Sequence, residues 1–178
     1  MKKTFHTLLF IFFLLSFSLI YSQDLTNLDN KFGFKKFKLE TPYSLYSKQL
    51  KFHLKGYDNV MYYDYVGNDI NLVFGGIVKK INLGFYNQKL YTISIELITD
   101  DNDDKRIQKE LINLFGYQKI NYSVSSEDTK YDWGVAWSTN KTYLQANKVS
   151  CTNENNPCRV EIFLFSQRLR REINNNQF

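Results

Sequence analysis

Hydrophobic positions recur at every second residue in the middle of the chain, over residues 59–98. This period is typical of β-strands with one buried face. It predicts a hairpin that turns near Asn87 and Gln88. The buried face of that hairpin is expected to carry Ile77, Ile81, Leu83, Phe85, Tyr91, Ile93, Ile95 and Leu97. Two earlier strands are expected at residues 59–66 and 70–74.

A helical period, with apolar residues three or four apart, appears twice. In the first case Thr41 can cap a helix over residues 42–56, which starts at a proline whose missing N–H costs nothing there. The residues at helical spacing in this segment are Leu45, Gln49, Phe52 and His53. In the second case the segment 99–116 ends in a glycine, and its apolar stripe consists of Ile107, Leu111, Leu114 and Phe115.

Strands are also expected on either side of the two helices. Three follow the second helix at residues 131–138, 142–150 and 159–166, and a short one precedes the first helix at residues 34–39. The order strand, helix, strands, helix, strands predicts an α+β fold. We interpret it as two successive helix-plus-antiparallel-meander units, with the helices packed on one face of the sheet.

The N-terminal residues have the layout of a secretory signal peptide. Lys2 and Lys3 come first, an apolar run begins at Leu8, and small residues lead to an expected cleavage after Ser22. The apolar run is shorter than the roughly 20 residues that span a bilayer. We therefore expect residues 1–22 to be removed, no transmembrane segment to remain, and the protein to be secreted or periplasmic.

The rest of the chain shows no Pro/Gly/Ser-rich linker, and its prolines are Pro42 and Pro157. Residues 23–33 are polar and are expected to form a loose lead-in, followed by a single α+β domain over residues 34–178. Loss of the leader with its two lysines lowers the formal net charge from +5 to +3. That charge is too small to indicate a nucleic-acid partner.

Both cysteines, Cys151 and Cys158, flank a short polar segment that ends in Pro157. In an oxidising compartment two such cysteines are expected to form a disulfide that closes the loop between neighbouring strands. A thioredoxin-type redox site needs two residues between the cysteines instead of six, and a zinc site lacks its other ligands.

The acidic run at residues 100–104 is the best candidate for a metal site. As an EF-hand loop, however, it places Lys105 where glycine is required and Leu111 where the bidentate glutamate is required. Capping of the second helix explains the run better, because carboxylates are favourable at a helix N-terminus. We expect neither a metal ion nor a cofactor.

Catalytic sets are also missing from the sequence. After removal of the leader the single histidine is His53, at the end of the first expected helix, where a structural role is the simpler interpretation. A hydrolase could still use two carboxylates, but no spacing selects a pair among Asp58, Asp64, Asp69, Glu96, Glu127, Asp128 and Asp132. We therefore expect a non-catalytic protein, with a small hydrolase as one alternative.

Aromatic residues make up 17% of the chain, and two groups of them lie on expected strands or turns. These candidate binding residues are Tyr57, Tyr62, Tyr63 and Tyr65 in the first group, and Tyr131, Trp133 and Trp137 in the second. Exposed rings would suit a protein or glycan partner, since they offer a large contact area with little entropy to lose. Core packing is the competing interpretation, and we favour it for the two tryptophans.

Two segments of the sequence resemble part of a known fold. The segment "FGGIVKKINLGFYNQKLYTISIEL" leads into a helix that ends "LINLFG", within a pattern of helix then meander given twice. This order resembles the β-lactamase-inhibitor-protein-like folds of small exported bacterial domains, over residues 34–166. The resemblance implies an α+β fold and binding to another exported or envelope protein. The predicted function is a binding module that acts through a protein–protein interface, with a glycan-binding module as an alternative.

Overall fold

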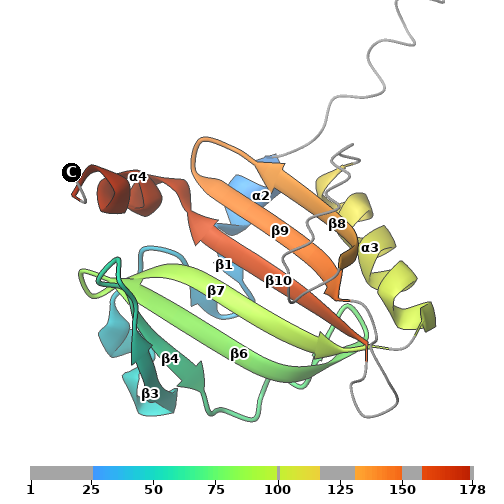
Figure 1. Cartoon of the computed structure of the whole chain (residues 1–178), viewed down its shortest axis with the longest axis horizontal. Helices are drawn as coiled ribbons and strands as arrows, with labels where there is room; N and C mark the ends of the chain where they lie inside the picture. The colour runs from blue at the N-terminus through green and yellow to red at the C-terminus, as the bar shows by residue number, and fades with distance from the viewer. Residues whose placement is uncertain (1–25, 100, 117–130, 150–157, 177–178) are drawn as a thin grey trace, which may run out of the picture.

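An antiparallel sheet lies at the centre of the fold (Figure 1). The computed structural model describes residues 26–99, 101–116, 131–149 and 158–176. Within them the strand order is β3-β4-β6-β7-β10-β9-β8, and β5 pairs with the start of β6. The strands are β3 (Leu50–Lys55), β4 (Met61–Tyr65), β5 (Leu72–Val73), β6 (Gly76–Tyr86), β7 (Lys89–Ile98), β8 (Tyr131–Ser138), β9 (Thr142–Val149) and β10 (Arg159–Ser166).

Short helices and one small hairpin lie at the ends and on both faces of this sheet, so the predicted packing of all helices on one face is wrong. They are α2 (Thr26–Lys31), the hairpin of β1 (Gly33–Phe34) and β2 (Phe37–Lys38), the 3-10 turns η1 (Tyr43–Leu45) and η2 (Ser47–Gln49), α3 (Asp101–Phe115) and α4 (Gln167–Asn175). In Figure 1, α2 and the β1–β2 hairpin lie behind the sheet, and α4 extends from the end of β10. Among the helices described, none is long and apolar enough to cross a membrane.

The predicted α+β class with an antiparallel sheet is confirmed, and the central hairpin is formed. Two of the residues predicted for its buried face are not in the core: Ile77 is 58% exposed, and Tyr91 is half-buried on the other face while Leu90 is in the core. Shifts of register between Val78 and Lys80 and between Gly84 and Phe85 interrupt the alternation near these two residues.

β6 pairs with β7 so that Ile81 faces Ile95 and Leu83 faces Ile93. Asn87 and Gln88 form the turn with φ angles of 47° and 62°. Positive φ at both central residues is the geometry that matches the twist of two hairpin strands.

The predicted helix over residues 42–56 is wrong. Two 3-10 turns occupy residues 43–49, and residues 50–55 form β3, which pairs with β4. The Thr41 hydroxyl donates to the Lys38 carbonyl at 2.6 Å and so does not cap a helix. Strand β4 provides hydrogen-bond partners for the backbone N–H and C=O groups of residues 50–55. This pairing determines the structure of the segment despite its weak helical period. The chain is therefore one large sheet with helices, and not two helix-plus-meander units.

The lead-in expected to be loose contains helix α2 in its described part. Leu28 of α2 is 2% exposed and belongs to the main core. Phe32 of the same segment also packs against that core, so this polar stretch is attached to the domain by apolar side chains. The expected leader, residues 1–22, lies outside the described residues. Cys158 directly precedes β10, but Cys151 lies outside them as well, so the disulfide stays a prediction.

The main core lies between one face of the sheet and α2 and α3. The stripe predicted for α3 is confirmed, since Ile107 and Leu111 are 0% and 1% exposed. Trp137 of β8 packs beside Phe115 with ring centroids 5.7 Å apart. Its indole N–H donates to the Gly116 carbonyl at 2.9 Å, which satisfies a carbonyl at the end of α3.

Candidate functional site

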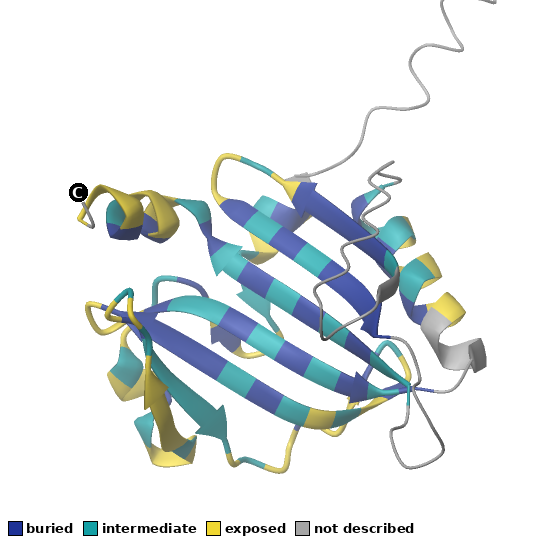
Figure 2. Cartoon of the chain, viewed as in Figure 1, coloured by how far each residue is buried: buried dark blue, intermediate teal, exposed yellow. Residues whose placement is uncertain are grey.

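The opposite face of the sheet carries side chains that are mostly half-buried, and we call it the open face. Figures 1 and 2 view the molecule from this side, where half-buried positions alternate with buried ones along the central strands. Strand register aligns its side chains in three rows: Gly84, Thr92, Phe165 and Tyr143; Asn82, Ser94, Phe163 and Gln145; Lys80, Glu96, Glu161 and Asn147. Within the described residues, α4 is the helix that packs on this face.

Three rings on the open face form what we call the aromatic cluster: Tyr91, Tyr143 and Phe165. Phe165 stacks on Tyr143 across neighbouring strands, with centroids 4.6 Å apart and planes inclined by 19°. Tyr91 lies on the other side of Phe165, at 6.0 Å between centroids. The guanidinium of Arg170 lies 4.9 Å from the Phe165 centroid, within cation–π range. Burial raises the pKa of Tyr91, so its hydroxyl is neutral at physiological pH.

An ordered row of polar groups continues from this cluster along β9. The Tyr143 hydroxyl donates to Gln145 Oε1 at 3.1 Å, and Gln145 Nε2 donates to Asn147 Oδ1 at 3.1 Å. The three residues are two apart in sequence and therefore point to the same face of the strand. These hydrogen bonds fix the orientation of two amides that face the same side as the aromatic cluster.

A cavity of about 300 Å³ lies at the β3 side of the open face. Its lining residues are His53, Leu54, Tyr62, Lys80, Asn82, Ser94, Glu96, Glu161 and Phe163. Asp64 holds two of the lining side chains in place, since Lys80 Nζ and Asn82 Nδ2 each lie 2.9 Å from Asp64 Oδ1. Burial raises the pKa of Asp64, but hydrogen bonds from Lys80 and Asn82 outweigh it, so the pKa lies below its usual value. Burial also raises the pKa of Tyr62, to about 12.

The acidic side of this cavity is Glu96 on β7, directly opposite Glu161 on β10. Like charges in such a pair repel unless cations lie between them. Arg159 Nε lies 3.3 Å from Glu161 and 3.8 Å from Glu96, and Lys79 Nζ lies 2.9 Å from Glu96. The open face therefore presents charges of both signs beside its aromatic cluster.

The carboxylates considered for hydrolysis do not form a pair in the described structure. Asp64 and Glu96 lie in different rows of the open face, and Asp69 contacts Lys36 in a loop. Glu127, Asp128 and the side chain of Asp132 lie outside what the structure describes. Glu96 has Glu161 as its neighbour, which the sequence did not single out. No group of three or more His, Cys, Asp or Glu side chains in the described part of the chain could hold a metal ion.

The structure separates the aromatic residues that the sequence grouped together. Trp137 is 0% exposed and cannot contact a partner, and Trp133 is half-buried against the main core. Tyr63 and Tyr65 pack against that core too. Tyr62 lies on the open face and Tyr57 is fully exposed. The side chain of Tyr131 lies outside the described ones.

Sequence reasoning missed Tyr143, Phe165 and Arg170. A signal for Phe165 exists in β10. Its outward positions Phe163 and Phe165 alternate with core residues, so the second half of β10 is apolar on both faces. A strand that is apolar on both faces is expected to be covered on both or to meet a partner.

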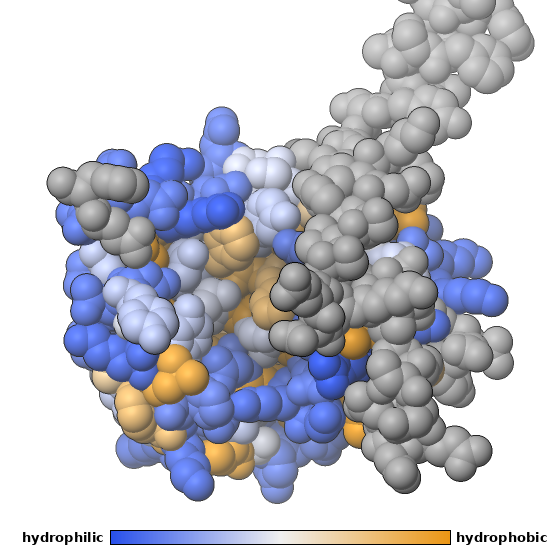
Figure 3. Space-filling model, viewed as in Figure 1, coloured by the Kyte–Doolittle hydropathy of each residue, from blue (hydrophilic) through white to orange (hydrophobic). Residues whose placement is uncertain are grey.

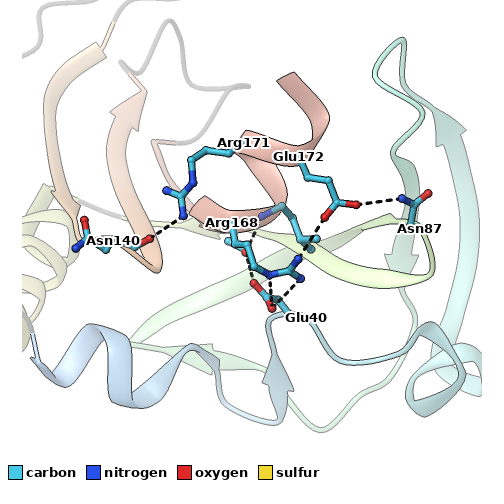
Figure 4. Close-up of polar contacts among 8 residues, drawn as sticks. Glu40, Asn87, Asn140, Arg168, Arg171 and Glu172 are labelled. Carbon is cyan, nitrogen blue, oxygen red and sulfur yellow. Dashed lines mark hydrogen bonds and ion pairs between the residues drawn. The ribbon is translucent and has the colours of Figure 1, made fainter. Parts of the chain in front are cut away.

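Helix α4 carries Arg170 over the aromatic cluster. Polar contacts of Arg168, Arg171 and Glu172 hold this helix in place (Figure 4). Arg168 points to Glu40 at 2.9 Å, and Glu172 accepts from Asn87 in the β6–β7 turn at 3.4 Å. Arg171 points the other way and donates to the Asn140 carbonyl at 3.4 Å. The apolar side of α4 is buried against the sheet by Leu169 and Ile173, which pack with Val60 and Tyr86. The helix thus joins both halves of the sheet at one end of the open face.

Glu40 is expected to make this attachment sensitive to pH. Burial raises its pKa, but hydrogen bonds from Arg168 and Ser166 outweigh burial and lower it. Its stabilisation is therefore present above the unfolded pKa of about 4.3 and is lost as pH falls through the lower folded pKa. Replacing Glu40 by Gln should cost about 0.5–1 kcal/mol at pH 7, because Arg168 is partly exposed.

Thermal unfolding of both proteins between pH 7 and pH 3 measures this effect. The difference between wild type and Glu40→Gln should shrink toward pH 3, while Glu110→Gln on the exposed side of α3 should differ little throughout. An equal difference at both ends of the pH range would contradict the assigned ion pair.

Comparison of the chain with protein-family models, with curated proteins and with solved structures found no match.

Proposed function

We propose that this protein is an exported, non-catalytic binding module that recognises another exported or envelope protein through its open face. The observation that carries the proposal is the aromatic cluster with Arg170 above it, half-exposed between charged side chains. Figure 3 shows orange and pale atoms in the middle of this face with blue atoms around them. Interface hot spots have this composition, with rings and arginine at the centre and polar residues at the rim.

The packing of the cluster also supports binding. Each ring is held by a neighbour, Phe165 by Tyr143 and Tyr91, and Arg170 is held by the ring beneath it. A side chain that is already ordered loses less conformational entropy when a partner arrives. The charges around Asp64, Lys80 and Glu161 would then select the partner by charge complementarity.

Two substitutions test the site. Arg170→Glu changes an exposed helix residue, and Tyr143→Ala removes one stacked ring, so the fold should survive both. Each should weaken partner capture by about tenfold or more, as loss of a hot-spot residue does. The measurement is cross-linking and quantitative pull-down from the native compartment. Tyr57→Ala is the matched control, because it removes an exposed ring elsewhere.

The outcomes separate the candidate sites. Loss of the partner with Arg170→Glu and Tyr143→Ala but not with Tyr57→Ala supports the open face. Retention with both open-face variants rules out this site. The reverse pattern would assign binding to the β3–β4 turn, where Tyr57 lies.

A glycan is the second candidate ligand, and one observation favours it. The ordered amides of Gln145 and Asn147 continue from a ring face, an arrangement that suits hydroxyl groups and an apolar sugar face together. Binding on a glycan array that Tyr143→Ala abolishes would favour this ligand over a protein. A flat array with folded protein would remove it.

A further inference from the structure

A second cavity lies on the other side of the sheet, between α2, α3 and the β1–β2 hairpin. It has a volume of about 330 Å³, within the range of about 300–1,000 Å³ typical of small-ligand sites. Its apolar lining consists of Leu28, Phe34, Phe74, Ile93, Ile95, Leu111, Leu114, Phe115, Leu144, Ile162 and Leu164. The sheet residues among them are almost fully buried, with Ile93 0% exposed, whereas Phe34, Phe74 and Leu114 are half-buried and accessible to a ligand.

The polar side chains that line this cavity are all lysines: Lys31, Lys35 and Lys38. All three are exposed, which places their ammonium groups at the opening. Lys38 Nζ donates to the Lys31 carbonyl at the end of α2, at 2.7 Å. Lys31 Nζ lies 5.6 Å from the centroid of Phe115, one of the lining rings. These two contacts hold Lys31 and Lys38 beside the cavity.

These lysines differ from their neighbour Lys36 in one respect. Lys36 is ion-paired with Asp69 at 2.8 Å. Among the described residues none of Lys31, Lys35 and Lys38 forms an ion pair, and no carboxylate lines the cavity. Three cations without a counter-charge at the opening of an apolar cavity match a ligand with one anionic head and an apolar tail.

We propose that this cavity binds a long-chain fatty acid, with its carboxylate at Lys31, Lys35 and Lys38 and its alkyl chain against the half-buried Phe34, Phe74 and Leu114. Burial of the chain supplies the affinity, because apolar surface leaves water. The ammonium groups orient the molecule by charge-assisted hydrogen bonds to the carboxylate. The site lies on the opposite face of the sheet from the aromatic cluster, so it is independent of the proposed partner surface.

Fluorescence titration with cis-parinaric acid tests the proposal on purified full-length protein that has been stripped of lipid. Palmitate should displace the probe, and its methyl ester, which lacks the charge, should do so about tenfold less well. Leu114→Trp replaces a half-buried lining residue by a larger side chain and should abolish probe binding. Far-UV circular dichroism and thermal unfolding verify that the variant is folded.

Charge reversal tests the head-group assignment. Lys35→Glu with Lys38→Glu should raise the Kd for palmitate by about tenfold. The matched control, Lys51→Glu with Lys55→Glu on the exposed strand β3, should leave it unchanged. Equal affinity for palmitate and its ester, unchanged affinity in the Lys35/Lys38 variant, binding by folded Leu114→Trp, or no probe binding would each overturn the proposal. Arg170→Glu should not affect palmitate, which keeps this test separate from that of the open face.

Discussion

Replacing Trp137 by alanine is expected to lower the free energy of unfolding by about 3–5 kcal/mol, the largest effect of any substitution proposed for this chain. The indole is 0% exposed and contacts Phe115 at the end of α3. Its removal leaves a cavity and also leaves the Gly116 carbonyl without its donor. Urea unfolding monitored by circular dichroism measures the loss.

Two further variants separate the causes. Trp137→Phe keeps most of the ring volume but not the N–H, so it should cost less than alanine by the cavity contribution. Trp133→Ala on the same strand should also cost less, since Trp133 is only half-buried. If both alanine variants lost the same free energy of unfolding, burial in the core would not explain the contribution of Trp137 to stability.

Replacing Leu169 by alanine is expected to cost about 2–3 kcal/mol and to weaken partner binding together with stability. Leu169 is 1% exposed and is the main apolar contact between α4 and the end of the sheet. If α4 loosens, Arg170 is no longer held over Phe165. Urea unfolding measures the loss of stability, and the pull-down used for Arg170→Glu measures the loss of partner binding.

The control is Leu45→Ala, which removes a leucine that is 67% exposed and should change stability by less than about 0.5 kcal/mol. Combining Leu169→Ala with Glu40→Gln should cost less than the two separate losses added together, because both weaken one attachment. Strict additivity would mean that Glu40 and Leu169 do not act on the same helix docking.

The fold was predictable where local pattern and long-range pairing agree. The β6–β7 hairpin and α3 show this, since most of their predicted core positions are buried; the exceptions in the hairpin, Ile77 and Tyr91, lie outside the segment between its two register shifts. Residues 50–55 show the opposite case. The apolar residues of this segment, at positions 50, 52 and 54, are compatible with a strand as well as with a helix. Pairing with β4 makes the segment a strand, and the local spacing of apolar residues does not reveal that pairing.

The open face was harder to predict for a different reason. Tyr143, Phe165 and Arg170 are far apart in sequence or on different elements, and strand register is what brings them together. Without the order of strands no pattern links β9 to β10 and α4. Tyr91 adds a second difficulty, because the irregular pairing between Gly84 and Phe85 changes the alternation beside it.

The position of β10 in the sheet has a consequence for how the chain folds. β10 is the last strand in sequence, yet it lies between β7 and β9 and pairs with both along its length. The two halves of the sheet therefore cannot join until β10 has been synthesised. Such distant pairing slows folding, because loop-closure entropy is lost before the contacts form. We expect a nascent chain that ends before Arg159 to remain open, and the final strand to set the rate at which the core closes.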